Sequence, residues 1–541
     1  MKILDVVIIG AGLSGIYAVH GARQRGWTVR AFEAGSGVGG AWYWNRYPGC
    51  RVDIEGVEFS YAFSDELQQE WTWSERYPSQ PEVERYLNHV CDRFDLRQHI
   101  TFNTRVKSVH FDEDRCYWQL STEAGETVLA HRVILATGLY SQPHRPPFKG
   151  LDSFEGRQLF TSNWPSDAVS FAGKRVGLIG TGASGIQIAP IIAREAAQLS
   201  VLQRTAVYTV PLRNGPADPQ RMREIKTNYS ALRKAEADSA LGFTHLHSRV
   251  APPVTQSALE VSDEERRRIY EDRWNSGGLC FYYTFTDLLS DEKANNTLAA
   301  FFEEKIRSRV SDPKIAKLLT PRDQPAMTKR LAGDTGYLET MERDNVELVD
   351  LRAEPIQTFT PNGIIVGDRE IALDIIVFAT GFDFGTGAMA QLDIRGRDGR
   401  CLREAWSDGV CTYLGLMAPK FPNLFWISGP GCPFYNPMLL AQYQFAQIER
   451  FVDQHAESGE PVEATEAAAA EWTELHNSIG NSTLFTKGDN YFIGGNIAGK
   501  PREVPLFLGG FQVYSEHCDK AAHTPGQFVR GTRTAGELQE S

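Results

Sequence analysis

The sequence contains no Cys-x-x-Cys motif. Its eight cysteines are scattered along 541 residues, at Cys50, Cys91, Cys116, Cys280, Cys401, Cys411, Cys432 and Cys518. This spacing argues against a disulfide framework, a zinc site and a redox dithiol. We therefore expect no metal centre and a reducing, cytoplasmic environment.

Long apolar runs and an excess of basic residues are also missing. No run approaches the about 18 uninterrupted apolar residues of a membrane span, so none is expected. The formal net charge of −12 offers no basic surface for a phosphate backbone, so nucleic acid is not an expected partner. With 541 residues, of which 42% are apolar, the chain is long enough for two or more globular domains.

A first nucleotide-binding pattern begins at the N-terminus. Residues 3–9 are β-branched and almost wholly apolar, as in a buried parallel strand, and they lead into Gly10, Gly12, Ser14 and Gly15. Glycines here permit a tight turn and let a pyrophosphate approach the backbone at a helix N-terminus. Eighteen residues after Gly15, Glu33 can accept hydrogen bonds from ribose hydroxyls and would repel a 2′-phosphate. This pattern favours FAD or NAD over NADP.

The same pattern recurs after an apolar strand at residues 174–179. The second turn and the start of its helix comprise Gly180, Thr181, Gly182, Ala183, Ser184, Gly185, Ile186 and Gln187. Nineteen residues beyond Gly185, the acid is replaced by Arg204, which is followed by Thr205. A guanidinium at this position can pair with the 2′-phosphate of NADPH. The two sites together indicate FAD and NADPH.

These patterns predict an α/β fold with two Rossmann-like dinucleotide-binding domains, for FAD and NADP, and a helical insertion in the NADP domain. Further strands end in Ala-Thr-Gly at residues 136–138 and 379–381, where the chain would pass between the domains. A capping box at 262–265 and a helix start near 290 indicate helices in the insertion. We expect the first part of the FAD domain at 1–140, a linker at 141–165, the NADP domain at 166–380 with its insertion at about 213–325, and the second FAD part with the C-terminal region at 381–541.

Several longer motifs occur in a fixed order. The first, at residues 39–53, reads Gly-Gly-Ala-Trp-Tyr-Trp-Asn-Arg-Tyr-Pro-Gly-Cys-Arg-Val-Asp, and it is followed by motifs at 203–205, 328–330 and 379–383. Over nearly the whole chain these resemble the type I Baeyer–Villiger monooxygenases. The resemblance implies an enzyme that uses FAD, NADPH and O2 to convert a ketone to an ester or lactone through a C4a-peroxyflavin. A monomer and a homodimer are both reasonable.

The resemblance also implies roles for individual residues. Arg330 aligns with the catalytic arginine of the family, which would stabilise negative charge, and Asp53 aligns with the aspartate that would hold it. Arg51 and Val52 would lie at the nicotinamide end, while Lys329 would join Arg204 and Thr205 at the 2′-phosphate. The further cofactor contacts that it implies are Gly40, Ala41, Trp42, Phe59, Val106, Met438 and Tyr491.

One motif departs from the family pattern. In the linker signature FxGxxxHxxxW, the sequence keeps Phe154, Gly156 and Trp164 but has Phe160 where a histidine is expected. Phe160 cannot form that hydrogen bond, which could alter NADPH positioning or coupling. Alternatively, its ring simply packs the linker, which is the interpretation that we favour because linker residues are usually structural.

Three other functions remain open. A heteroatom (S or N) oxygenating flavin monooxygenase could use the same scaffold, but it would need no arginine to stabilise charge on a carbonyl substrate. A disulfide reductase also carries FAD and NADPH, yet the missing Cys-x-x-Cys removes its redox relay. A non-enzymatic nucleotide-sensing module would not account for Arg330.

Overall fold

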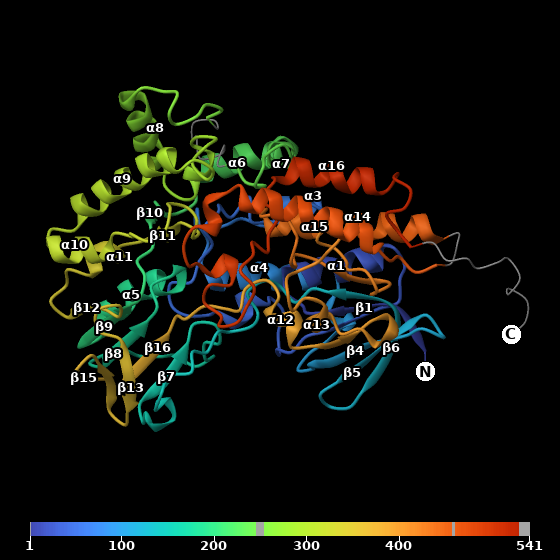
Figure 1. Cartoon of the computed structure of the whole chain (residues 1–541), viewed down its shortest axis with the longest axis horizontal. Coiled ribbons are helices and arrows are strands. Elements are labelled where there is room, and N and C mark those ends of the chain that lie inside the picture. Colours follow the sequence, from blue (N-terminus) through green and yellow to red (C-terminus); the bar gives the residue numbers. More distant parts are fainter. Residues whose placement is uncertain (1, 245–253, 457–459, 530–541) are drawn as a thin grey trace, which may run out of the picture.

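The computed structural model describes residues 2–244, 254–456 and 460–529. Figure 1 shows two lobes side by side, each with a sheet and covering helices, and further helices lying above them. The part of the expected insertion at 245–253 lies outside the described residues. Within the described ranges, no helix is both long enough and apolar enough to cross a membrane.

The first sheet has eight strands, in the order β17-β4-β5-β6-β1-β2-β3, with β18 paired to β6. Its central strand β1 is almost wholly apolar and pairs in parallel with β2 and β6, as expected for a strand covered on both faces. The last two strands come from the C-terminal part of the chain. The bounds are β1 Ile3–Ile9, β2 Val29–Phe32, β3 Ile100–Thr101, β4 Val106–Asp112, β5 Tyr117–Thr122, β6 Thr127–Leu135, β17 Asp393–Arg395 and β18 Leu424–Trp426.

The second sheet has five strands, in the order β12-β9-β8-β16-β7, and all of its pairs are parallel. Its edge strand β7 lies within the segment 141–165 that the sequence predicts as a linker. The bounds are β7 Arg157–Phe160, β8 Arg175–Ile179, β9 Gln198–Gln203, β12 Val346–Asp350 and β16 Ile375–Phe378. Two small sheets accompany it, formed by β10 Thr209–Pro211 with β11 Ala332–Asp334, and by β13 Ile356–Thr360, β14 Gly363–Val366 and β15 Arg369–Ala372.

Helices fill the predicted insertion and cover both sheets (Figure 1). Ser262 accepts a hydrogen bond from the backbone N–H of Glu265 and begins α8, which confirms the predicted capping box. The insertion comprises α6 Pro219–Thr227, α7 Tyr229–Ala237, α8 Asp263–Ser276, α9 Glu292–Arg309 and α10 Pro313–Leu319. The other helices are α1 Leu13–Gln24, α2 Ala41–Trp44, α3 Asp65–Glu70, α4 Gln80–Arg93, α5 Ala183–Glu195, α11 Tyr337–Thr340, α12 Gly387–Ala390, α13 Leu402–Ala405, α14 Pro437–Ala456, α15 Glu466–Asn481 and α16 Phe511–Ala521.

Candidate active site

The two glycine turns have the same backbone geometry. Gly10 and Gly180 both have φ of +105°, a conformation that L side chains rarely adopt. A Cβ on Gly15 would lie 1.9 Å from the Gly10 carbonyl oxygen, and one on Gly185 would lie 2.1 Å from that of Gly180. Each helix can therefore pack this closely on its strand only with glycine, which explains the spacing in the sequence.

The helices that follow the turns present open N-termini. Their N-cap residues, Gly12 and Gly182, have no side chain to cap the first N–H groups of α1 and α5. A Cβ on Gly182 would meet no atom within 4 Å. The backbone of Gly12 lies close to that of Gly40, and a Cβ on Gly40 would lie 2.9 Å from the Gly12 Cα. Bare backbone and free N–H groups at a helix N-terminus fit a pyrophosphate.

The two residues expected to distinguish FAD from NADPH, Glu33 and Arg204, have different surroundings. Glu33 is buried, and its carboxylate accepts hydrogen bonds from the backbone N–H groups of Ala11 at 2.8 Å and Gly35 at 2.7 Å. Arg204 is exposed and forms no ion pair within the described ranges. Burial and the like charge of Arg204 lower the pKa of Lys329 to about 8. The positive charges of Arg204 and Lys329 together fit a phosphate.

The residues predicted around FAD lie on different elements, and most gather near the first turn. The Trp42 and Phe59 rings are 5.5 Å apart, Met438 is fully buried at the start of α14, and Ser14 bonds to Ser428 at 3.2 Å. The side chain of Val106 instead packs in a separate core on the first sheet. Any nucleotide contact of Val106 must therefore be made by its backbone.

Arg330 and Asp53 form a partly buried ion pair although 277 residues separate them in the sequence. Nη2 of Arg330 lies 3.0 Å from Oδ2 of Asp53, and their side chains are 31% and 7% exposed. Burial by itself lowers the pKa of Arg330, but the Asp53 carboxylate outweighs it and raises that pKa above its ordinary value. Burial also raises the pKa of Asp53, a shift that Arg330 opposes. The guanidinium is thus permanently charged, and its Nε has no hydrogen-bond partner among the described residues.

Three tyrosines that the sequence analysis did not connect with Arg330 lie near it. Tyr140, Tyr282 and Tyr491 each contribute to the raised pKa of Arg330. Of these, only Tyr491 belonged to the predicted contacts. Tyr140 and Tyr282 follow an Ala-Thr-Gly strand end and a Gly-Gly pair respectively, and nothing in those local patterns indicates a shared site.

Other predicted cofactor residues already have partners within the protein. Nη1 of Arg51 pairs with Glu75 at 2.8 Å and donates to the Tyr77 carbonyl at 3.2 Å. The backbone N–H of Val52 donates to the Pro78 carbonyl at 3.2 Å. In the second unit, the hydroxyl of Thr181 donates to the Thr205 carbonyl at 2.9 Å. These bonds fix the loops that would surround the nucleotides.

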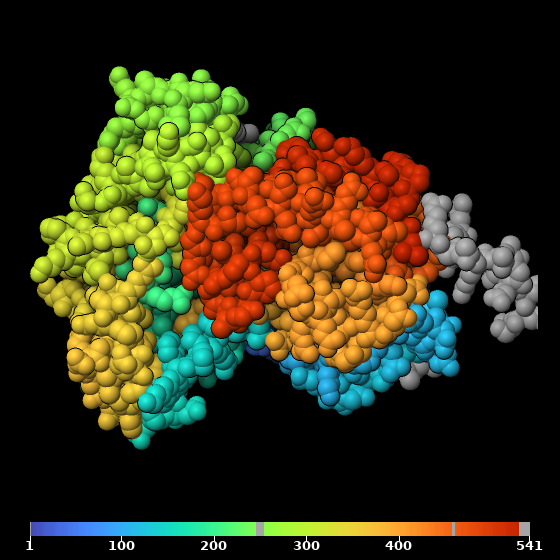
Figure 2. Space-filling view, viewed as in Figure 1, coloured from blue at the N-terminus to red at the C-terminus, as the bar shows by residue number. Residues whose placement is uncertain are grey.

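The segment around Tyr491 is fastened to the strand end after β16. Asn496 donates to the Phe382 carbonyl at 2.8 Å, and Nζ of Lys500 lies 2.5 Å from Asp383. The Tyr491 ring lies 5.6 Å from that of Phe384. Figure 2 shows a hollow between this C-terminal region, in orange to red, and the lobe of the second sheet, in green to yellow.

Phe160 is the last residue of β7. Its ring stacks on Phe378 with centroids 4.6 Å apart and an interplanar angle of 13°. The guanidinium of Arg145 covers the same ring at 4.6 Å. This packing agrees with the structural interpretation of Phe160, and an effect of the missing histidine on coupling stays a prediction.

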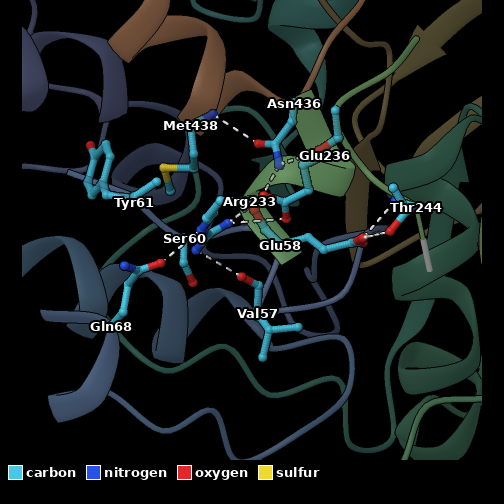
Figure 3. Close-up of polar contacts among 12 residues, drawn as sticks. Val57, Glu58, Ser60, Tyr61, Gln68, Arg233, Glu236, Thr244, Asn436 and Met438 are labelled. Carbon is cyan, nitrogen blue, oxygen red and sulfur yellow. Dashed lines mark hydrogen bonds and ion pairs between the residues drawn. The ribbon is translucent and has the colours of Figure 1, made fainter. Parts of the chain in front are cut away.

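A buried polar network joins the helical insertion to both parts of the first unit (Figure 3). From α7, Arg233 pairs with Glu236 at 2.8 Å and donates to the Val57 carbonyl at 3.3 Å. Asn436, just before α14, donates to the carbonyls of Glu58 at 2.8 Å and Gly242 at 3.0 Å. Segments that precede and follow the insertion are thereby held together beside Phe59 and Met438.

Replacing Arg233 with methionine should lower the free energy of unfolding by about 3 kcal/mol, because it removes one partner of a buried ion pair. The side chains of Arg233 and Glu236 are 13% and 0% exposed. Urea denaturation followed by tryptophan fluorescence measures the change. The control is Arg267→Met, whose pair with Glu304 is 53% and 52% exposed and should contribute less than about 1 kcal/mol. Equal effects of the two substitutions would contradict the argument.

Comparison with known proteins now adds to this geometry. A sequence model of the family "Pyridine nucleotide-disulphide oxidoreductase" matches residues 7–237. All eight cysteines are free thiols, and the sequence has no Cys-x-x-Cys, so the match concerns the nucleotide-binding fold rather than a dithiol.

Several curated proteins match nearly the whole chain, and three of them show the range of their activities. A Baeyer-Villiger monooxygenase of Pseudooceanicola batsensis is 40% identical and covers 94% of this chain and 93% of its own length. A cyclohexanone 1,2-monooxygenase of Acinetobacter is 38% identical with the same coverage. A phenazine N-monooxygenase of Lysobacter antibioticus is also 38% identical, covering 94% of each chain.

Solved structures agree with this result. An oxidised steroid monooxygenase bound to NADP is 46% identical with a TM-score of 0.92, covering 98% of this chain and 100% of its own. A structure of OTEMO in complex with FAD and NADP is 38% identical with a TM-score of 0.91, covering 96% and 98%. The chain therefore belongs to the Baeyer–Villiger monooxygenases, flavoproteins that use FAD and NADPH to convert ketones to esters or lactones.

Proposed function

We propose that Arg330 and Asp53 are the catalytic pair of this enzyme. The observation that carries the proposal is their partly buried ion pair of 3.0 Å, in which the Nε of Arg330 has no hydrogen-bond partner among the described residues. A fixed, charged donor stabilises the negative charge that develops on the oxygen of a ketone during oxygen insertion. Asp53 holds the guanidinium in position and keeps it charged.

The two glycine turns and their acidic or basic partners support the assignment of the cofactors to sites. FAD would lie on α1 with its ribose at Glu33, and NADPH on α5 with its 2′-phosphate between Arg204 and Lys329. When bound, NADPH supplies a hydride, and FAD passes the electrons to O2 and delivers one oxygen atom to the ketone. Asp53 lies two residues after Arg51, whose carbonyl is bonded to α5, the helix proposed to bind NADPH. It also lies six residues before Phe59, a proposed FAD contact, so the chain places it between the two sites.

Domain limits, location and assembly form part of the same proposal. Residues 1–140 and 381–541 would form the FAD unit and 166–380 the NADP unit, supported by β17 and β18 pairing with strands of the first sheet. Eight free thiols support a reducing cytoplasm. We further propose O2 as co-substrate and a monomer or homodimer, which size-exclusion chromatography with light scattering would distinguish.

The test is NADPH oxidation by the purified yellow protein with a panel of cyclic and aryl ketones under air, followed by product mass analysis. Ketone-dependent oxidation with an ester or lactone one oxygen atom heavier supports the proposal. Peroxide release with every ketone, together with clean oxygen transfer to a sulfide or an aromatic nitrogen, would favour the heteroatom oxygenase instead.

The affinity for NADPH should fall as the pH rises through about 8. Burial and Arg204 lower the pKa of Lys329 to about 8, so its ammonium pairs with the 2′-phosphate below this pH and loses its charge above it. We expect KM for NADPH to rise about five- to tenfold between pH 7 and 9. In Lys329→Met, KM should be high at pH 7 and nearly independent of pH. An unchanged pH profile in the variant would exclude Lys329 as the titrating group.

A further inference from the structure

A buried hydrogen-bonded bridge connects the second nucleotide unit to the loop that carries Asp53. The hydroxyl of Tyr47 donates to Oε1 of Gln187 at 2.7 Å, and Nε2 of Gln187 donates to the backbone carbonyl of Arg51 at 3.2 Å. Gln187 lies on α5, the helix that follows the second glycine turn. Both ends of its amide are thus bonded to the loop of the first unit.

The loop is also packed into the core of the second unit. Tyr47 and Cys50 belong to the buried cluster formed mainly by the second sheet and α5. Gly49 has φ of +86°, and a Cβ there would lie 2.7 Å from the carbonyl oxygen of Gln187. The backbone of residues 47–51 is thus in close contact with the backbone of α5, so a shift of α5 displaces this loop as well.

The bonding pattern fixes the orientation of the Gln187 amide. Burial raises the pKa of Tyr47 well above its ordinary value, so the phenol keeps its proton and acts as the donor. The Arg51 carbonyl can only accept, so Nε2 must face it, and Oε1 then faces the Tyr47 hydroxyl. Tyr47 and Gln187 are each 6% exposed, so these bonds do not compete with bulk water.

The ion pair at Asp53 extends this bridge to the proposed catalytic arginine. Only Val52 separates the bonded carbonyl of Arg51 from Asp53. The other side of the loop is held where Gln80 donates its backbone N–H to the Cys50 carbonyl at 2.8 Å and Val52 donates to Pro78. Besides the direct ion pair with Arg330, α5 therefore gives the NADP unit a contact with the backbone next to Asp53.

We propose that Tyr47 and Gln187 are positioning residues that couple the NADP unit to the Asp53–Arg330 pair. The inference rests on the proposed function of that pair. Nucleotide binding at the N-terminus of α5 then sets the position of residues 46–53, and the ion pair with Asp53 transmits this position to the guanidinium of Arg330. This assigns Gln187 a different role from a direct contact with NADPH, since both of its amide atoms already have partners.

The experiment compares Tyr47→Phe and Gln187→Met with Tyr208→Phe as the matched control. Tyr208 is also 6% exposed, and its hydroxyl makes one bond, to the Pro321 carbonyl at 3.3 Å. Tyr47→Phe removes one hydroxyl from a residue that lies on the loop of the first unit, outside the second glycine turn. Hydrogen exchange of the amides at 46–53 with and without NADP⁺ is measured on each holoenzyme, together with kcat, KM for NADPH and product formed per NADPH.

We expect NADP⁺ to slow amide exchange at 46–53 in the wild type and in Tyr208→Phe. In Tyr47→Phe and Gln187→Met, this protection should fall by at least about half. Ketone oxygenation should fall about three- to tenfold in kcat, with KM for NADPH changed less than about twofold. A raised KM in Gln187→Met, with Tyr47→Phe like its control, would overturn the inference in favour of a direct contact. An absence of protection in the wild type would also overturn it. Because exchange is read without ketone, a wild type that oxygenates no ketone would contradict the proposed function separately.

Discussion

Replacing Arg330 with alanine should reduce ester or lactone formation about 100- to 1,000-fold, the effect of removing a preorganised donor from a developing negative charge. The guanidinium lies 3.0 Å from Asp53, whose carboxylate raises its pKa and keeps it charged. FAD should remain bound because Arg330 contributes nothing to the first glycine turn. NADPH should still be oxidised, with hydrogen peroxide released in place of the oxygenated product.

The measurement combines product mass analysis, peroxide detection and the flavin absorbance of the purified variant. Arg330→Lys keeps the charge but loses the planar fork, so we expect it to recover only part of the activity. Asp53→Asn leaves the partly buried guanidinium without its counter-charge and should lower product formation with less effect on flavin reduction. Normal ester formation by Arg330→Ala would remove Arg330 from the mechanism.

The two nucleotide units could be predicted from the sequence because their signals are local. Each consists of a strand, a glycine turn and a helix within about 20 residues, and the steric demands at Gly15 and Gly185 leave no alternative to glycine. The difference between Glu33 and Arg204 is equally local, since it depends on the end of the next strand. The helix starts at Ser262 and near residue 290 follow from capping chemistry and are confirmed.

The contacts between the units could not be predicted in this way. The Tyr47–Gln187 bond joins residues 140 positions apart, and the Arg233 network joins α7 to segments on both sides of it in the sequence. Neither has a periodic pattern, because the partners meet only when two lobes pack together. Asp53 and Arg330 were found only through the family resemblance, for an isolated arginine after a lysine is ordinarily a solvated surface residue.

Replacing Arg204 with alanine should collapse the preference for NADPH over NADH. Arg204 is exposed after β9 and has no protein counter-ion among the described residues, so its charge is available to the 2′-phosphate. Charge-assisted hydrogen bonds to such a group contribute about 1.5–3 kcal/mol, so kcat/KM for NADPH should fall about 10- to 150-fold. The value for NADH should stay nearly constant, since NADH has no phosphate at this position.

The control is Arg175→Ala, at the start of β8, where the arginine pairs with Asp374 at 2.7 Å. This substitution also removes one positive charge from the second sheet, but at the opposite end of the strands. An effect that came only from the change in net charge would therefore appear in both variants. We expect the ratio of kcat/KM for the two nucleotides to change only in Arg204→Ala. Because we also propose Lys329 at the 2′-phosphate, the double variant with Lys329→Met should lose more discrimination than either single change. If the ratio survives in the double variant, the 2′-phosphate is recognised elsewhere and the assignment of NADPH to the turn at Gly180 fails.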